Sequence, residues 1–400
     1  MNHHSKTAGN VLQYLTAVLA ACLVFAIMQG IHDNYGVMLN GIVSHTGISY
    51  ASVSLVIAVG QILYGATQPL FGYLALKKSN AFVMLCGVLL MAVGLIATPC
   101  CGNLPLLLLF FGIVLPSGTG ALCFGIVMGA IAPIIGERRA AFTSGIVQAS
   151  AGVGDALMSP GLQYLIASRG IAFTMTAFSV PILLTIPAVI WLGRRSRRVQ
   201  GAPQPERQEK LPEILRSAFR DSTCWKLLAG FTTCGFHMAI IETHLFSQYV
   251  SSGIPGGIAS LALTCYGVFT MLGAALTGFL TLRFRMKNVL AVIYGGRVLI
   301  AVAFLLLPKT VPFAFIATAL LGMTGDSTVP PTTGIISHRV GMSRMAIVYG
   351  AIFIGHQLGA FASAGLGGLL VSTPLGYSGL WIMDLALSAI AATASFRIRE

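Results

Sequence analysis

The sequence predicts an all-α membrane protein in which twelve transmembrane helices form two six-helix halves. Composition is the first observation: 56% of the 400 residues are hydrophobic, only 9% are charged, and the mean hydropathy is +0.85. Soluble domains carry about 25% charged residues, so this chain excludes a soluble enzyme, a disordered protein and a fibrous protein. The other two observations are long apolar stretches along the whole chain and a repeat that relates its halves.

The apolar stretches are each long enough to cross a bilayer as a helix, which takes about 20 residues. Their continuous apolarity favours helices over barrel strands, in which apolar and polar residues would alternate. The first stretch is too long for a signal-peptide core, and we keep it as a mature span. The predicted helices cover 12–38, 51–75, 81–99, 104–134, 141–167, 172–193, 225–250, 257–282, 289–306, 311–336, 344–371 and 378–396.

The positive charge follows this division. Twenty-one of the 24 Lys and Arg residues lie before the first helix, after the even-numbered helices or in the central gap, and the exceptions are Arg169, Arg297 and Lys309. Because cytoplasmic loops retain Lys and Arg, we expect both termini and the central loop in the cytoplasm of a multi-pass protein of the plasma membrane, here a bacterial inner membrane. The net charge of +13 therefore marks topology. No nucleic-acid partner is expected, since such proteins gather basic residues on a solvated face.

The eight cysteines indicate no further chemistry. They lie mostly inside the predicted helices, and none forms a CxxC pair. We predict no structural disulfide, no metal site and no cofactor.

The two halves of the chain match at one offset. The shared offset of 205 or 206 residues over four helix pairs is harder to obtain by chance than any single match. The chain is therefore divided into a half at 1–193, a basic linker at 194–224 with an amphipathic piece near 211–219, and a half at 225–400. The matches are Gly30-Ile31-His32 with Gly235-Phe236-His237, Gly72 to Lys77 with Gly278 to Arg283, Thr119-Gly120 with Thr324-Gly325, Arg139 with Arg344, and Gly145 and Gly154 with Gly350 and Gly359.

A parallel repeat of two six-helix halves is typical of major facilitator transporters, which expose a central site alternately to the two sides. Several segments also resemble the oxalate/formate antiporter and monocarboxylate transporter branch of that superfamily. They are Tyr35-Gly36-Val37, Gly60-Gln61, Gln68-Pro69-Leu70-Phe71-Gly72, Arg138-Arg139, Gly145-Ile146, Gly235-Phe236-His237, Pro330-Pro331-Thr332 and Gly355-His356-Gln357-Leu358-Gly359-Ala360. The resemblance implies that the helices at 12–38, 104–134, 225–250 and 311–336 line the cavity.

Two departures from the family pattern bear on mechanism. Leu76 stands where the superfamily places an acidic residue after its second helix, so the latch that this carboxylate forms must be absent or made differently. The helix at 257–282 also lacks the Asp and Arg that proton-coupled monocarboxylate carriers have there.

Ionisable groups at membrane depth are candidate functional residues, because burying them is costly unless they are paired or hydrated. The helix at 12–38 carries Gln29, His32, Asp33 and Tyr35 in an otherwise apolar run. They either line the cavity or mark a helix end that already reaches the outer interface.

The helix at 225–250 carries His237, Glu242 and His244. The two histidines are seven residues apart and are expected to share one face, whereas Glu242 points elsewhere. They could simply hydrogen-bond neighbouring helices. However, His237 repeats His32 across the two halves, as expected for a site at the centre of the bilayer.

The remaining candidates are spread over several helices. Asp326 lies before Pro330-Pro331, which cannot complete the helical hydrogen bonds, so a break is expected there. His356 and Gln357 are expected to flank the cavity. For Asp155, Arg297 and Asp384 the choice between function and structure stays open, and nearby glycines are expected to let helices approach closely.

These residues predict a secondary active transporter, and no enzyme, because no catalytic motif is present. We expect a monomer in the bilayer that moves a small organic solute, with a monocarboxylate-like metabolite favoured, and that couples this transport to protons. The alternative is an exporter of a drug or siderophore-like compound, and a membrane-embedded sensor without transport is a remote alternative. Substrate binding is assigned to Gln29, His32, Tyr35, His237, His244, His356 and Gln357, and proton coupling to Asp33, Glu242 and Asp326.

Overall fold

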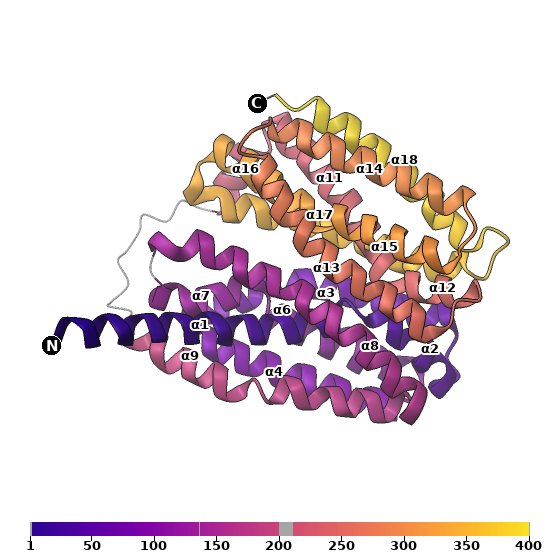
Figure 1. Ribbon diagram of the computed structural model, residues 1–400, viewed down its shortest axis with the longest axis horizontal. Helices are drawn as coiled ribbons and strands as arrows, with labels where there is room; N and C mark the ends of the chain where they lie inside the picture. The colour runs from indigo at the N-terminus through magenta and orange to yellow at the C-terminus, as the bar shows by residue number, and fades with distance from the viewer. Residues whose placement is uncertain (1, 136, 200–210, 400) are drawn as a thin grey trace.

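The computed structural model describes residues 2–135, 137–199 and 211–399, and every regular element within them is a helix. Figure 1 shows α1 to α9 in one bundle and α11 to α18 in a second bundle beside it. The N-terminus and the C-terminal end of α9 lie toward one end of the molecule, which we call the linker end. Helices α2 and α12 lie at the opposite end, which we call the far end.

The first bundle contains α1 to α9. Its elements are α1 (Asn2–His32), α2 (Tyr35–Thr46), α3 (Tyr50–Lys77), α4 (Asn80–Ala97), η1 (Thr98–Cys100), α5 (Leu104–Leu107), the π-helical η2 (Leu108–Val114), α6 (Leu115–Ala121), α7 (Phe124–Ile135), α8 (Glu137–Leu183) and α9 (Ile186–Val199).

The second bundle follows the amphipathic helix α10 (Leu211–Ala218), which matches the piece expected near 211–219. Its elements are α11 (Ser222–Ala239), the π-helical η3 (Ile240–Leu245), α12 (Phe246–Ser251), α13 (Gly256–Leu280), α14 (Met286–Leu306), α15 (Val311–Thr324), the 3-10 turn η4 (Asp326–Thr328), α16 (Val329–Val340), α17 (Met342–Leu370) and α18 (Gly376–Phe396). Part of the predicted linker, 200–210, lies outside the described residues.

Ten helical segments of the described chain are long and apolar enough to cross a membrane. One of them, Thr143–Ser196, spans 54 residues and contains the fifth and sixth predicted helices, which meet at a kink where Gly170 has a φ of 79°. The tenth predicted helix is interrupted between α15 and α16 and so does not count as one segment. The segments are therefore consistent with the twelve helices predicted.

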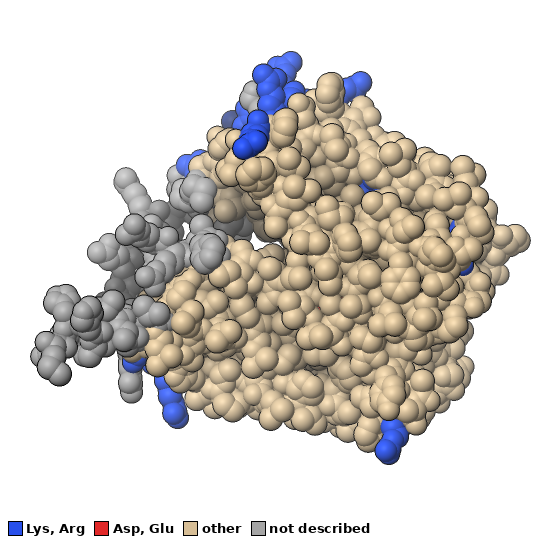
Figure 2. All heavy atoms as spheres, viewed as in Figure 1, with Lys and Arg blue, Asp and Glu red and all other residues tan. Residues whose placement is uncertain are grey.

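The outer surface has the character of a membrane-facing surface. Large apolar side chains such as Leu157, Leu299 and Leu306 are exposed. In Figure 2 the coloured part of this face is almost entirely tan, and Lys and Arg appear mainly toward its margins. Such a surface suits lipid, because charged groups are costly within the hydrocarbon core.

The sequence repeat corresponds to two equivalent helix crossings. A Cβ added to Gly154 would overlap the carbonyl oxygen of Ala26, where α8 crosses α1. A Cβ added to Gly359 would overlap the carbonyl oxygen of Thr232, where α17 crosses α11. At both crossings glycine therefore lets two backbones approach closely, as predicted for these residues.

The two bundles meet along two helix pairs, α3 with α17 and α8 with α13. Along the first pair, an added Cβ on Gly365 would lie 3.6 Å from that of Ala58, and one on Gly65 would lie 3.1 Å from Cβ of Gln357. Moving toward the linker end on α3 therefore means moving backwards along α17, so the helices pack antiparallel. Seven more residues along each helix lead from Gly65 to Gly72 and from Gln357 to Gly350.

At the linker end this packing stops. A Cβ added to Gly72, Gly145, Gly278 or Gly350 would meet no described atom within 4 Å. These four glycines lie on α3, α8, α13 and α17, the same helices that pack together nearer the far end. Figure 2 shows a small opening between the bundles beside the grey residues. The bundles are thus joined toward the far end and separated toward the linker end.

A capped helix start connects α10 to the second bundle. The backbone N–H of Thr223 donates to the Asp221 carboxyl over 2.8 Å, which makes Asp221 the N-cap of α11. This hydrogen bond, more than the nearby Arg339 and Lys226, holds the pKa of Asp221 below its usual value, against the opposing effect of burial. The ion pair with Arg339 is 3.6 Å long and partly exposed, so it adds little stability.

We predict that Asp221→Ala lowers the free energy of unfolding by about 1 kcal/mol at neutral pH, since it removes the cap. Because the pKa of Asp221 is lowered by folding, this stabilisation is present above the ordinary aspartate pKa of about 4 and is lost as the pH falls through the lower folded value. Unfolding of the purified protein in detergent, followed at several pH values, measures the difference. Asp221→Asn is the control, because asparagine also caps helices well, and an equal loss in both variants would contradict the role of the cap.

Candidate functional site

A break in the first membrane segment positions His32 and Asp33. Helix α1 ends at His32 and α2 begins at Tyr35, so two residues interrupt the helical run. The twelve residues of α2 then extend about 18 Å further toward the far end. The polar cluster therefore does not mark the outer end of this segment, which was the alternative to a position inside the protein.

His32 and Asp33 form the core of this cluster. The two atoms His32 Nδ1 and Asp33 Oδ1 are 3.1 Å apart, and Gln29 Nε2 donates to the same carboxyl oxygen over 2.6 Å. The His32 side chain is 3% exposed, and its Nε2 has no hydrogen-bond partner among the described residues. Its ring also lies 4.5 Å, between centroids, from the ring of Tyr64 on α3. One histidine nitrogen is thus available for a further polar partner.

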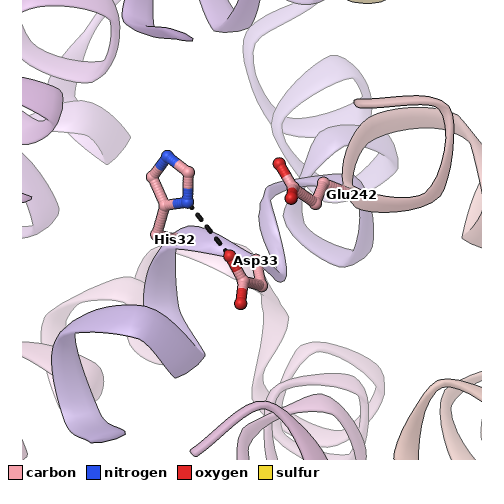
Figure 3. Close-up of side chains that lie close together, drawn as sticks. All are labelled: His32, Asp33 and Glu242. Atoms are coloured by element: carbon pink, nitrogen blue, oxygen red, sulfur yellow. Dashed lines mark hydrogen bonds and ion pairs between the residues drawn. The ribbon is translucent and has the colours of Figure 1, made fainter. Parts of the chain in front are cut away.

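Glu242 approaches this cluster from the second bundle. It lies in η3, where the wider π-helical turn replaces the α-helix between α11 and α12. Figure 3 shows the Glu242 carboxyl facing the space between His32 and Asp33. One nitrogen or oxygen atom from each of the three side chains lies within 4.8 Å of the other two. Titratable side chains from the two bundles therefore lie close together at this point.

Gly36 permits this close approach. A Cβ on Gly36 would lie 2.6 Å from the carbonyl oxygen of Glu242 and 2.8 Å from that of Thr243. Real Cβ atoms do not approach backbone oxygens so closely, so only glycine lets α2 and η3 touch here. This gives a physical reason for glycine in the Tyr35-Gly36-Val37 segment.

A chain of hydrogen bonds extends from Glu242 across the bundles. Gln61 Nε2 on α3 donates to Glu242 Oε2 over 3.2 Å, and Gln357 Nε2 on α17 donates to the Gln61 backbone oxygen over 2.9 Å. His356 Nδ1 lies 2.9 Å from Gln357 Oε1, and the His356 ring stacks on Phe353. The predicted residues His356 and Gln357 are therefore connected to Glu242, and Gln61 is the link between them.

Two further acids lie around this group. Asn34 Nδ2 donates to Asp155 Oδ1 over 2.8 Å, and the other carboxyl oxygen of Asp155 has no partner among the described residues. Asp326 begins η4, the break between α15 and α16, as expected from the prolines that follow it. Its side chain is only partly buried and lies close to Gln148 of α8, in the other bundle.

His237 and His244 do not share one face, and this expectation was wrong. His237 Nδ1 lies 2.8 Å from Asp384 Oδ2 on α18, whereas His244 Nδ1 lies 2.9 Å from the Tyr50 hydroxyl on α3. The π-helical η3 between them adds a residue to the turn and so rotates His244 and Glu242 relative to α11. Glu242 was expected to point away from the site, and the same rotation directs it toward His32.

Both histidines are completely buried in this state. His244 Nε2 is 3.1 Å from the Ala364 carbonyl oxygen, which can only accept, so Nε2 carries the hydrogen and donates it. In the neutral ring Nδ1 then accepts a hydrogen bond from the Tyr50 hydroxyl. His244 thus ties the bundles together toward the far end, and its predicted contact with substrate stays a prediction.

Gln61, Tyr50 and Tyr64 were not among the predicted site residues. They lie on α3, which is not among the helices that the resemblance implies to line the cavity. Gln61 could have been found as a glutamine within an apolar stretch. It also belongs to one of the segments that resemble known transporters.

The donor set of His32, Asp33 and Glu242 is also of a kind that could hold a divalent cation, with one nitrogen and two carboxylate oxygens. We predicted no metal site from the sequence, and that expectation stays a prediction.

Two membrane-spanning bundles, related by a sequence repeat and joined around a buried polar site, define the class of secondary transporters. The family profile described as Major Facilitator Superfamily matches residues 17–364, and the chain belongs to that superfamily. It is therefore a multi-pass membrane protein of a family of transporters.

Solved structures show the same fold. The crystal structure of a D-xylose-proton symporter is similar with a TM-score of 0.73 and 13% identity, over 98% of each chain. The transporter FucP, in the outward conformation, is similar with a TM-score of 0.64 and 16% identity, over 97% of this chain and 100% of the other. No curated protein sequence matches this chain significantly. The oxalate/formate and monocarboxylate branch suggested by the motifs stays a prediction.

Proposed function

We propose that this protein is a proton-coupled transporter of a small organic solute, which it moves by alternating access. The observation that carries the proposal is the group formed by His32, Asp33 and Glu242, whose polar atoms lie within 4.8 Å although they come from different bundles. The proposed units are the two halves 1–193 and 225–400, joined by the linker 194–224.

Charge balance makes this group suited to exchanging a proton. Two carboxylates close together in a poorly solvated site cannot both stay ionised without a compensating cation. When Asp33 and Glu242 face each other, a bound proton supplies that compensation. When the bundles rotate and separate them, each carboxyl meets a different environment, and the proton can leave on the other side.

The same balance favours a monocarboxylate as the solute, as proposed from the resemblance. The polar atoms described around Glu242 belong to Gln61, His32 and Asp33, so an incoming carboxylate would meet histidine and acids. An anion can then bind only together with a proton, which is the coupling expected of a symporter. Gln29, Tyr35, His356 and Gln357 are the proposed contacts for the rest of the solute, with Asp326 as a second proton site. Export of a drug or siderophore-like compound is the alternative.

The fold comparison supports the proposal without fixing the solute. One protein of similar fold is described as a D-xylose-proton symporter, so this fold is compatible with proton coupling. A single chain contains both bundles and the group between them, so we propose that it works as a monomer.

We predict that Glu242→Gln abolishes accumulation driven by a pH gradient, because the variant cannot release a proton from this position. In proteoliposomes with radiolabelled lactate as the probe, the purified variant should therefore accumulate no lactate above its equilibrium distribution. Exchange of lactate without a gradient should persist. Glu213→Gln is the control, since Glu213 is exposed on α10. Full gradient-driven accumulation by Glu242→Gln would contradict the proton site, whereas a wild type inactive with lactate but active with another solute would contradict only the monocarboxylate.

Alternating access predicts a second arrangement of α3 and α17. If α3 and α17 keep their antiparallel register when the linker end closes, Gly72 comes to lie opposite Gly350. With the native cysteines replaced by serine, the pair Gly72→Cys/Gly350→Cys should then form a disulfide. The control pair Ala58→Cys/Gly365→Cys should form one in the present state, because the Cβ separation of 3.6 Å suits a disulfide.

Each disulfide should arrest transport, and a molecule should never contain both. Mass spectrometry after oxidation during turnover measures both pairs, with the four substitutions combined in one protein. Formation of both disulfides in one molecule, or failure of the first pair at every stage of transport, would contradict the proposed motion.

A further inference from the structure

Arg297 is a strong base buried completely inside the second bundle, and the site described above does not use it. It lies on α14 with a side-chain exposure of 0%. Its Nη2 donates to the carbonyl oxygens of Thr324 over 2.5 Å and Gly325 over 2.9 Å. These carbonyls stand at the end of α15, where the chain breaks before η4. Arg297 therefore binds the main chain at the interruption of the tenth predicted helix.

The position suits a cation for two reasons. The last carbonyls of a helix have no intrahelical donor, and the helix dipole places partial negative charge there. Arg297 supplies both a donor and a positive charge, and the Tyr294 ring lies 5.3 Å from its guanidinium. The interaction satisfies the carbonyls and partly satisfies a buried guanidinium that would otherwise be very costly.

The sequence repeat shows that only the second half has an arginine bound to the main chain at the helix break. The equivalent break in the first bundle follows Thr119-Gly120, whose carbonyls accept from the backbone N–H groups of Leu122 and Cys123. At offsets of 205 and 206 residues, the counterparts of Arg297 are Ala92 and Met91, which cannot donate hydrogen bonds. The first break is thus closed by its own main chain, whereas the second is held by a side chain.

The second break leads directly to the contact between the bundles. Asp326 follows Gly325 and lies close to Gln148 of the first bundle. Two residues later, Thr328 Oγ1 lies 3.3 Å from the Cys234 sulfur on α11, and that sulfur is 3.4 Å from Arg297 Nη2. Arg297 therefore binds the main chain before Asp326. It also contacts Cys234, the residue that Thr328 contacts after Asp326.

We propose that Arg297 is a positioning residue that holds the break between α15 and η4, and that it thereby keeps Asp326 against Gln148 of the other bundle. Arg297 does not touch the solute. The proposal needs neither lactate nor proton coupling, and it concerns how one bundle presents an acid to the other.

Hydrogen–deuterium exchange of the purified full-length protein tests this directly. In Arg297→Met, exchange in the peptide covering 322–330 should rise by at least about 10-fold, the factor expected for losing a charge-assisted hydrogen bond to the main chain. Peptides from α3 and α8 should keep their wild-type rates. In Arg297→Lys, whose ammonium can also donate to carbonyls, exchange at the break should be closer to wild type than in Arg297→Met. Unchanged exchange at the break in Arg297→Met, or an equal rise throughout the protein, would overturn the proposal.

Two further variants complete the test. Lys309→Met is the control, because Lys309 donates to the Phe304 and Leu307 carbonyls at the end of α14, away from the break. Lys309→Met should raise hydrogen–deuterium exchange only at the end of α14. If Arg297→Met fails to fold, the double variant Arg297→Lys/Gln148→Ala is compared with each single variant. The two substitutions should change exchange at the break non-additively, and additive changes would overturn the link between Arg297 and Asp326.

Discussion

The structure depends on the close approach of two acids, Asp33 and Glu242, which come from opposite bundles to within 4.8 Å of each other in a chain with only 9% charged residues. An apolar surface lets the molecule lie in lipid, but it also makes any buried carboxyl costly unless it finds a partner. His32, Gln29 and Gln61 provide partners here, and Gly36 lets the two backbones approach. In the mechanism proposed above, the bundles stay joined here only while this charge is balanced, and their relative position is thereby linked to proton binding.

The repeat explains both what the halves share and where they differ. The crossings at Gly154 and Gly359 are equivalent because each half must pack its helices by close backbone contact, and glycine is the residue that allows this. The repeated glycines at the linker end, Gly72 with Gly278 and Gly145 with Gly350, stand apart in this state and are available for packing in another. Some polar side chains, such as His32 and His237, are repeated, but others are not, as Arg297 and its counterpart Ala92 show.

Much of this arrangement could be predicted from the sequence. Apolar stretches and the repeat gave the all-helical fold, and cost of burial identified His32, Asp33 and Glu242. The direction of the Glu242 side chain could not be predicted, because it follows from a π-helical turn for which the sequence contains no recognisable pattern. The pairing of His237 with Asp384 was also hidden, since it joins residues 147 positions apart through helix packing. Gln61 was overlooked because it lies on α3, outside the helices expected to line the cavity, and only helix packing brings it to Glu242.

The central claim is that Asp33 and Glu242 hold a proton between them while the bundles are joined toward the far end. Infrared spectroscopy of the purified protein, locked in this state by the Ala58→Cys/Gly365→Cys disulfide, measures it through the stretching band of protonated carboxyl groups. At neutral pH the account predicts a component of this band that disappears in Glu242→Gln or Asp33→Asn and persists in Glu213→Gln. A band that is absent, or that neither substitution at the site changes, would contradict the account.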